Sequence, residues 1–101
     1  MRNWSKPLSF SAANEQRVPN RPGVYVLLRT EIDPSSVLKI ASSRSLREAF
    51  KQVADEPVAN WPVRPQGFLY FESLSESEEA KRFLAEFKRR RGQQPMYNSG
   101  F

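Results

Sequence analysis

The sequence predicts one α+β domain built on a small, mainly antiparallel three-stranded sheet that is flanked by helices. Two short β-branched runs separated by a turn cluster predict a hairpin, and a later aromatic run predicts a third strand. Two segments with apolar residues at helical spacing follow the second and third runs. A chain of 101 residues has the length of a single domain. We assign residues 1–20 to a short, packed N-terminal extension and residues 21–98 to the core.

The composition restricts both the setting and the chemistry of this domain. The chain is 39% hydrophobic and 27% charged, and it has neither Cys nor His. The lack of Cys excludes disulfides and favours the cytoplasm, whereas the lack of His leaves carboxylates, Tyr, Lys or Arg for any catalysis. No apolar run has the length of a membrane span, so we expect no membrane partner. The net charge of +5 favours anionic partners such as nucleic acid, although a basic surface can also serve solubility alone.

The N-terminal extension contains scattered apolar residues and is expected to pack on the core. Residues 8–10 have the pattern of a short added strand. Ser11 is a candidate cap for one or two helical turns, which end before Pro19. Trp4 is expected to anchor this arm by packing rather than to stack on a nucleobase.

The hairpin is predicted at residues 23–29 and 37–41. Pro22 and Gly23 mark its start, and residues 33–36 form a strong turn cluster. Alternate side chains of the first strand point to opposite faces, and both sets are apolar. We therefore expect this strand to be covered on both sides.

The first core helix is predicted at residues 45–54, with Ser45 and Glu48 as a capping box. Its apolar stripe comprises Leu46, Ala49, Phe50 and Val53. The proline-rich residues 55–66 are predicted to form a loop that Trp61 anchors, and residues 67–72 to form the third strand.

The second core helix is predicted to begin after Ser75 and to end before Gly92, which is a good C-cap. Ser75 and Glu78 form a second candidate capping box, and Leu74 is placed to staple the helix start. The predicted core stripe of this helix comprises Ala80, Phe83, Leu84 and Phe87.

Four short features stand out along these elements. Gly23-Val24-Tyr25 opens the predicted hairpin, and Lys39-Ile40-Ala41 closes it. The long helix carries Glu86, and the run Pro95-Met96-Tyr97-Asn98 follows that helix. In this order and spacing, the elements resemble the GIY-YIG nuclease family over residues 21–98. The first two runs fall on the two family signatures, Glu86 falls where the family has its glutamate, and the last run matches the family's Pro-x-Tyr-Asn ending.

The resemblance implies phosphodiester hydrolysis with one divalent metal ion, Mg²⁺ or Mn²⁺. By analogy, Glu86 would hold the metal, Tyr25 would assist the attacking water and Asn98 would support the site. Lys39 replaces the second signature's tyrosine and offers a positive charge to a phosphate, but it lacks the phenol. Ala49 stands where the family has an arginine, and Arg47 lies two residues earlier, on roughly the opposite side of the helix. Two further family positions, the signature glycine and the lysine after it, are occupied by Ala41 and Ser42.

We therefore expect a nuclease-like domain that binds nucleic acid, with DNA favoured, and whose phosphodiesterase activity is weakened or lost. A protein partner could supply its targeting. The expected phosphate contacts are Arg44, Arg47, Lys51, Lys88, Arg89, Arg90 and Arg91.

Two other functions remain open from the sequence. One is an active, divergent endonuclease that uses Tyr25, Glu86 and Asn98. The other is a protein-interaction or regulatory module whose surface is formed by Trp4, Trp61 and Phe101.

Each candidate catalytic residue also has a purely structural interpretation. Tyr25 can be a core residue, and Asn98 can tie the tail to the core by hydrogen bonds. Glu86 can pair with neighbouring basic residues on the same helix.

Overall fold

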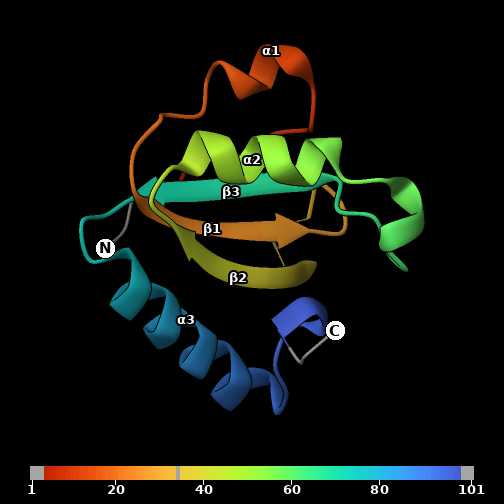
Figure 1. Cartoon of the computed structure of the whole chain (residues 1–101). Helices are drawn as coiled ribbons and strands as arrows, with labels where there is room; N and C mark the ends of the chain where they lie inside the picture. Colours follow the sequence, from red (N-terminus) through yellow and green to blue (C-terminus); the bar gives the residue numbers. More distant parts are fainter. Residues whose placement is uncertain (1–3, 34, 99–101) are drawn as a thin grey trace.

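The computed structural model describes residues 4–33 and 35–98, and it contains one sheet with helices on both of its faces (Figure 1). Phe101, which the sequence places in a candidate interaction surface, lies outside these residues. The elements in chain order are α1 (Ala12–Glu15), β1 (Gly23–Leu28), β2 (Val37–Ser43), α2 (Leu46–Asp55), the 3₁₀ turn η1 (Val58–Asn60), β3 (Gly67–Glu72), α3 (Glu76–Arg91) and the 3₁₀ turn η2 (Met96–Asn98).

The three strands form an antiparallel sheet in the order β2-β1-β3, so the predicted α+β class and sheet are confirmed. Tyr25 at the middle of β1 lies opposite Ala41 of β2 and Tyr70 of β3. The register between β1 and β2 shifts by one residue after Leu27, which pairs with Lys39. This bulge lets Leu38 join the core on one side of the sheet.

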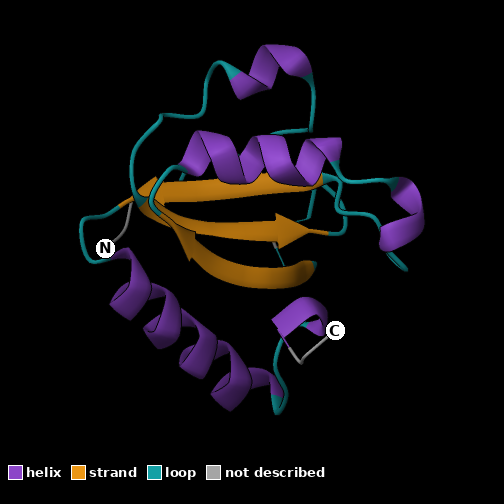
Figure 2. Ribbon diagram, in the orientation of Figure 1, coloured by secondary structure: helices purple, strands orange, loops and turns teal. Residues whose placement is uncertain are grey.

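The two faces of the sheet carry separate apolar clusters. Helix α2 covers one face, and helix α3 covers the other (Figure 2). On the α2 face, Leu27 packs with Phe50 and Phe68. On the α3 face, Val24 and Val26 pack with residues of β2, β3 and α3. The prediction that the first strand is covered on both sides is confirmed.

The N-terminal extension packs along the free edge of β3. The backbone amides and carbonyls of Leu8 and Phe68 exchange two hydrogen bonds of 2.8 Å, so the predicted strand at residues 8–10 is reduced to one bridge. The Trp4 ring makes T-shaped contacts with Phe71 and Phe83, with centroid separations of 4.6 and 5.3 Å. The expected packing role of Trp4 is confirmed.

The helix ends follow the sequence in part. The Ser11 and Ser45 hydroxyls cap α1 and α2 as predicted. They accept hydrogen bonds from the backbone N–H groups of Asn14 and Glu48. The second capping box is wrong, because Ser75 makes no side-chain cap and its own amide donates to the Ser73 hydroxyl at 3.0 Å. The predicted staple is also wrong, since Leu74 is 92% exposed. Gly92 ends α3 with φ at 77°, as predicted.

Replacing Gly23 by Ala tests the close packing at the start of β1. An added Cβ would clash with the Phe71 carbonyl oxygen and would lie 2.7 Å from Leu46 Cδ1. We expect Gly23→Ala to lower the free energy of unfolding by about 1–3 kcal/mol in urea denaturation. The control Gln52→Ala, on the exposed side of α2, should stay within about 0.5 kcal/mol of the parent. Equal stabilities for the two variants would contradict this account.

Candidate functional site

The sheet separates the residues that the family resemblance predicts to act together. Tyr25 stacks on Phe68 in the cluster beneath α2, with centroids 5.3 Å apart. Lys39 pairs across the strands with Leu27, which belongs to the same face. Glu86 instead lines a pocket on the α3 face together with Val26 and Ile40. The structure therefore groups Tyr25 with Lys39 and leaves Glu86 on the other side.

Tyr25 is a largely covered phenol within the aromatic packing of the α2 face. Its ring lies nearly parallel to that of Phe68, at an interplanar angle of 10°. Burial raises the pKa of Tyr25 above the ordinary value of 10.0, because the phenolate would lose its hydration. At neutral pH the hydroxyl keeps its proton, so it is suited to packing and to hydrogen-bond donation.

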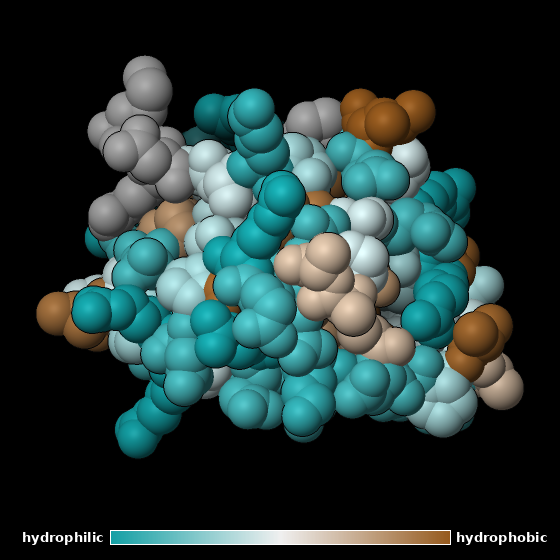
Figure 3. All heavy atoms as spheres, turned by 90° about the horizontal axis from the view of Figure 1, so that it is seen from above, coloured by the Kyte–Doolittle hydropathy of each residue, from teal (hydrophilic) through white to brown (hydrophobic). Residues whose placement is uncertain are grey.

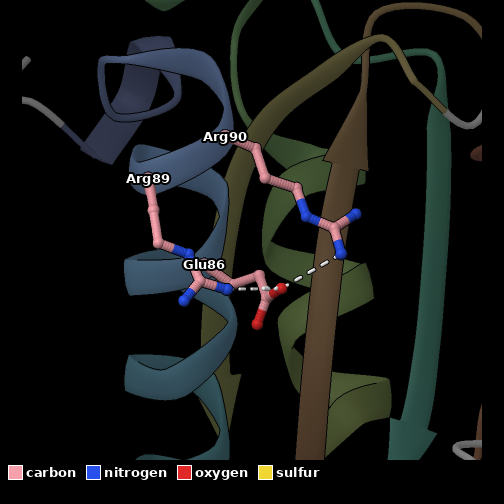
Figure 4. Close-up of polar contacts among 3 residues, drawn as sticks. All are labelled: Glu86, Arg89 and Arg90. Carbon is pink, nitrogen blue, oxygen red and sulfur yellow. Dashed lines mark hydrogen bonds and ion pairs between the residues drawn. The ribbon is translucent and has the colours of Figure 1, made fainter.

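Glu86 is an ion-pairing residue at the C-terminal half of α3 (Figure 4). Its Oε1 accepts from Arg89 at 3.0 Å and from Arg90 at 3.1 Å. The two arginines stand three and four residues further along the helix, which is the spacing of neighbours on a helix surface. The structural interpretation of Glu86, as a partner of nearby basic residues, is confirmed.

The surroundings of Glu86 do not fit the divalent metal that the family resemblance implies. Mg²⁺ and Mn²⁺ are held by several oxygen ligands, and nearby cations oppose their binding. Here the carboxylate has two guanidinium neighbours. Within the described residues, no group of three or more acidic side chains is arranged to hold a metal ion.

Asn98 fastens the C-terminal tail to the outer edge of β2. Its Oδ1 accepts from the Ile40 N–H at 2.9 Å, and its Nδ2 donates to the Ile40 carbonyl at 2.9 Å. The side-chain amide thus imitates one residue of a neighbouring strand. Beside it, the Tyr97 hydroxyl accepts from the Val63 N–H at 2.9 Å and donates to the Val63 carbonyl at 2.5 Å. The expected tethering role of Asn98 is confirmed.

The basic residues predicted to contact phosphate fall into two groups on different sides of the sheet. Arg44 is exposed just before α2, and Lys51 is exposed within it. Arg47 is partly buried, and its Nε donates to the Val18 carbonyl at 2.8 Å, so it holds the N-terminal extension. The second group comprises the exposed residues of the last turn of α3, namely Lys88, Arg89, Arg90 and Arg91.

A pocket of about 490 Å³ lies beside the last turns of α3. Its walls come from the sheet, from α3 and from the N-terminal extension through Trp4. Glu86, Arg90 and Arg91 provide its charged groups. Sequence reasoning missed this pocket, because its walls come from segments that are distant in the sequence.

The aromatic residues proposed for a protein-binding surface do not gather on one face. Trp4 packs on the α3 side, whereas Trp61 contacts Tyr97 at 4.8 Å between ring centroids, in the other cluster. The face seen in Figure 3 is mostly hydrophilic with scattered hydrophobic side chains. Large apolar side chains that are exposed, such as Ile32 at 86% and Leu74 at 92%, belong to separate loops.

Comparison with known proteins found no matching family model, no matching curated protein and no matching solved structure. The GIY-YIG resemblance therefore depends on the motifs and on the order of the elements. In the described part of the chain, no helix has the length and apolar character needed to cross a bilayer.

The titration of Tyr25 can be measured directly. We expect a phenolate titration followed by absorbance to contain a step with its midpoint above 10.0 that Tyr25→Phe removes. The phenol holds its proton more tightly in the folded state than in the unfolded chain. Protonated Tyr25 therefore contributes to the free energy of unfolding below pH 10, and this contribution is lost as the pH rises through the folded pKa. Tyr70→Phe is the comparison variant, because burial and Glu72 also raise the pKa of Tyr70. A Tyr25 step below the ordinary value would contradict the burial argument.

Replacing Asn98 by Ala tests the attachment of the tail to β2. Two hydrogen bonds to Ile40 disappear, so we expect the free energy of unfolding to fall by about 1–3 kcal/mol in urea denaturation. Asn98→Asp should not restore stability at neutral pH, because a carboxylate oxygen would face the Ile40 carbonyl. Gln93→Ala, an exposed change in the same tail, is the control. An unchanged stability for Asn98→Ala would argue that Asn98 has no tethering role.

Proposed function

We propose that this chain is a DNA-binding domain on a GIY-YIG-like fold that contacts phosphates through the last turn of α3 and has lost metal-dependent cleavage. The observation that carries this proposal is the exposed run of four cations at residues 88–91. Two described carboxylates act on this run: Glu86 pairs with Arg89 and Arg90, and Asp33 interacts electrostatically with Arg91. Exposed Arg and Lys side chains bind phosphates with little dependence on sequence.

The order of the elements supports a GIY-YIG-like fold. A hairpin, a helix, a third strand and a long helix follow one another as the resemblance implies. The tail that carries Asn98 then returns to the middle of β2. Gly23 of the first signature lies where β1 packs closely against Phe71 and Leu46.

The distribution of the candidate catalytic groups favours binding over cleavage. General base assistance and metal activation need the acting groups within reach of one phosphate. Tyr25 and Lys39 share the α2 face, whereas Glu86 lies on the α3 side. The oxygen and the nitrogen of the Asn98 side-chain amide both form hydrogen bonds with the Ile40 backbone.

The binding surface is tested by anisotropy with a short labelled DNA duplex at several salt concentrations. We expect the affinity for DNA to fall as the salt concentration rises. The Arg89→Ala/Arg90→Ala variant should bind more weakly, and its plot of log affinity against log salt concentration should be shallower by the equivalent of about two phosphate contacts. The matched control is Lys81→Ala/Arg82→Ala, which removes two exposed cations from an earlier turn of the same helix. If both double variants lost affinity equally, the charge of the whole protein rather than this run would govern binding.

Cleavage is tested separately with supercoiled plasmid in the presence of Mg²⁺ or Mn²⁺. We expect no nicking, and we expect Glu86→Ala to bind duplex at least as well as the parent, since its loss frees two guanidinium groups. Nicking that Glu86→Ala abolishes would instead identify a divergent endonuclease. A protein with neither salt-dependent binding nor nicking would point to a protein partner.

A further inference from the structure

The pocket beside the last turns of α3 has the size and walls of a small-ligand site. Its volume of about 490 Å³ lies within the usual range of about 300–1,000 Å³ for such sites. Val26 and Ile40 of the sheet and Phe83 and Phe87 of α3 provide apolar wall, and Trp4 closes it from the N-terminal extension.

The charged side chains that line the pocket are mostly basic. Among the described residues they are Arg90, Arg91 and one carboxylate, Glu86. The Arg91 guanidinium lies 5.2 Å from the centre of the Phe87 ring, which orients it along the wall. The contacts of Glu86 with Arg89 and Arg90 both use Oε1, and neither arginine contacts Oε2 (Figure 4).

We propose that this pocket receives one unstacked nucleobase of a bound single strand, with the flanking phosphates on Arg90 and Arg91. This inference rests on the proposed function, because it places the pocket beside the phosphate-binding run. Bases have flat faces that pack on aromatic and apolar walls, and guanidinium groups nearby neutralise the connecting phosphates. A base that is paired within a duplex is not available to such a pocket.

Glu86 determines which ligands complement the pocket. A free carboxylate acceptor favours the exocyclic amino group of cytosine, adenine or guanine, whereas thymine presents no amino group. The two arginines would receive the carboxylate of an apolar acid as they would a phosphate, and the apolar wall would suit either ligand. The feature that distinguishes the two is the exocyclic amino group of the base, which can donate to Glu86.

The first test is a fluorescence titration of the full chain carrying Trp61→Phe, in which Trp4 is the remaining tryptophan. Trp4 lines the pocket, so a bound base should quench it in a saturable way. We expect dCMP to bind about tenfold more tightly than TMP, the effect of one hydrogen bond to a charged acceptor. Oligo-dC should likewise bind more tightly than oligo-dT or an abasic strand of equal length.

Variants separate base recognition from phosphate contact. Glu86→Ala should remove the preference for dCMP over TMP while it maintains or raises duplex affinity. Glu78→Ala, an exposed change on the same helix, removes the same charge and should retain the preference. Leu69→Phe should fill part of the pocket without adding a second tryptophan and should weaken quenching of Trp4, and circular dichroism should establish that each variant is folded.

The outcomes distinguish the two proposals. A folded parent that shows no Trp4 response to any mononucleotide, or equal responses to dCMP and TMP, would overturn the base pocket. The proposed function would still stand if salt-dependent duplex binding through Arg89 and Arg90 were intact. Saturable binding of dCMP without salt-dependent binding of any DNA would retain the pocket and reject the phosphate surface. Quenching by a simple aromatic acid as strong as that by dCMP would also overturn the inference.

Discussion

The double-sided burial of β1 is the constraint on which the rest of the structure depends. The strand is paired along both edges, with β2 on one side and β3 on the other. Val24, Leu27 and Leu28 are almost completely buried, and each such side chain contributes about 1.5–3 kcal/mol through removal from water. Because successive side chains alternate, one face requires α2 as a cover and the other requires α3. The close approach of Phe71 and Leu46 to Gly23 belongs to the same packing.

The C-terminal tail covers part of the outer edge of β2. An edge strand presents unpaired backbone groups, and natural proteins cover or block such edges. Asn98 occupies both groups of Ile40, while Tyr97 is held by the Val63 backbone. The Tyr97 and Asn98 side chains of the Pro-x-Tyr-Asn run thus both have a structural role in this chain.

The position of α3 decides the chemistry that the domain can offer. Placing α3 opposite α2 puts Glu86 and the arginine run on one face, and it leaves Tyr25 and Lys39 on the other. On this face the Glu86 carboxylate forms ion pairs with the guanidinium groups of Arg89 and Arg90. The same placement forms a pocket between α3, the sheet and Trp4. The proposed phosphate contact and base insertion both use this face of the sheet.

The sequence by itself determined the local features. The apolar stripes of α2 and α3, the C-cap at Gly92 and the Glu86 ion pairs depend only on residues a few positions apart, so periodicity and spacing predicted them. The predicted cap at Ser75 and the predicted staple at Leu74 were wrong. The Ser75 amide donates to the Ser73 hydroxyl, and the Leu74 side chain is exposed in the loop before α3. Only the tertiary structure decided which face of the sheet each helix covers. An apolar stripe shows that a helix must be buried but not against which side, so the separation of Tyr25 from Glu86 and the pocket beside Trp4 were beyond sequence reasoning.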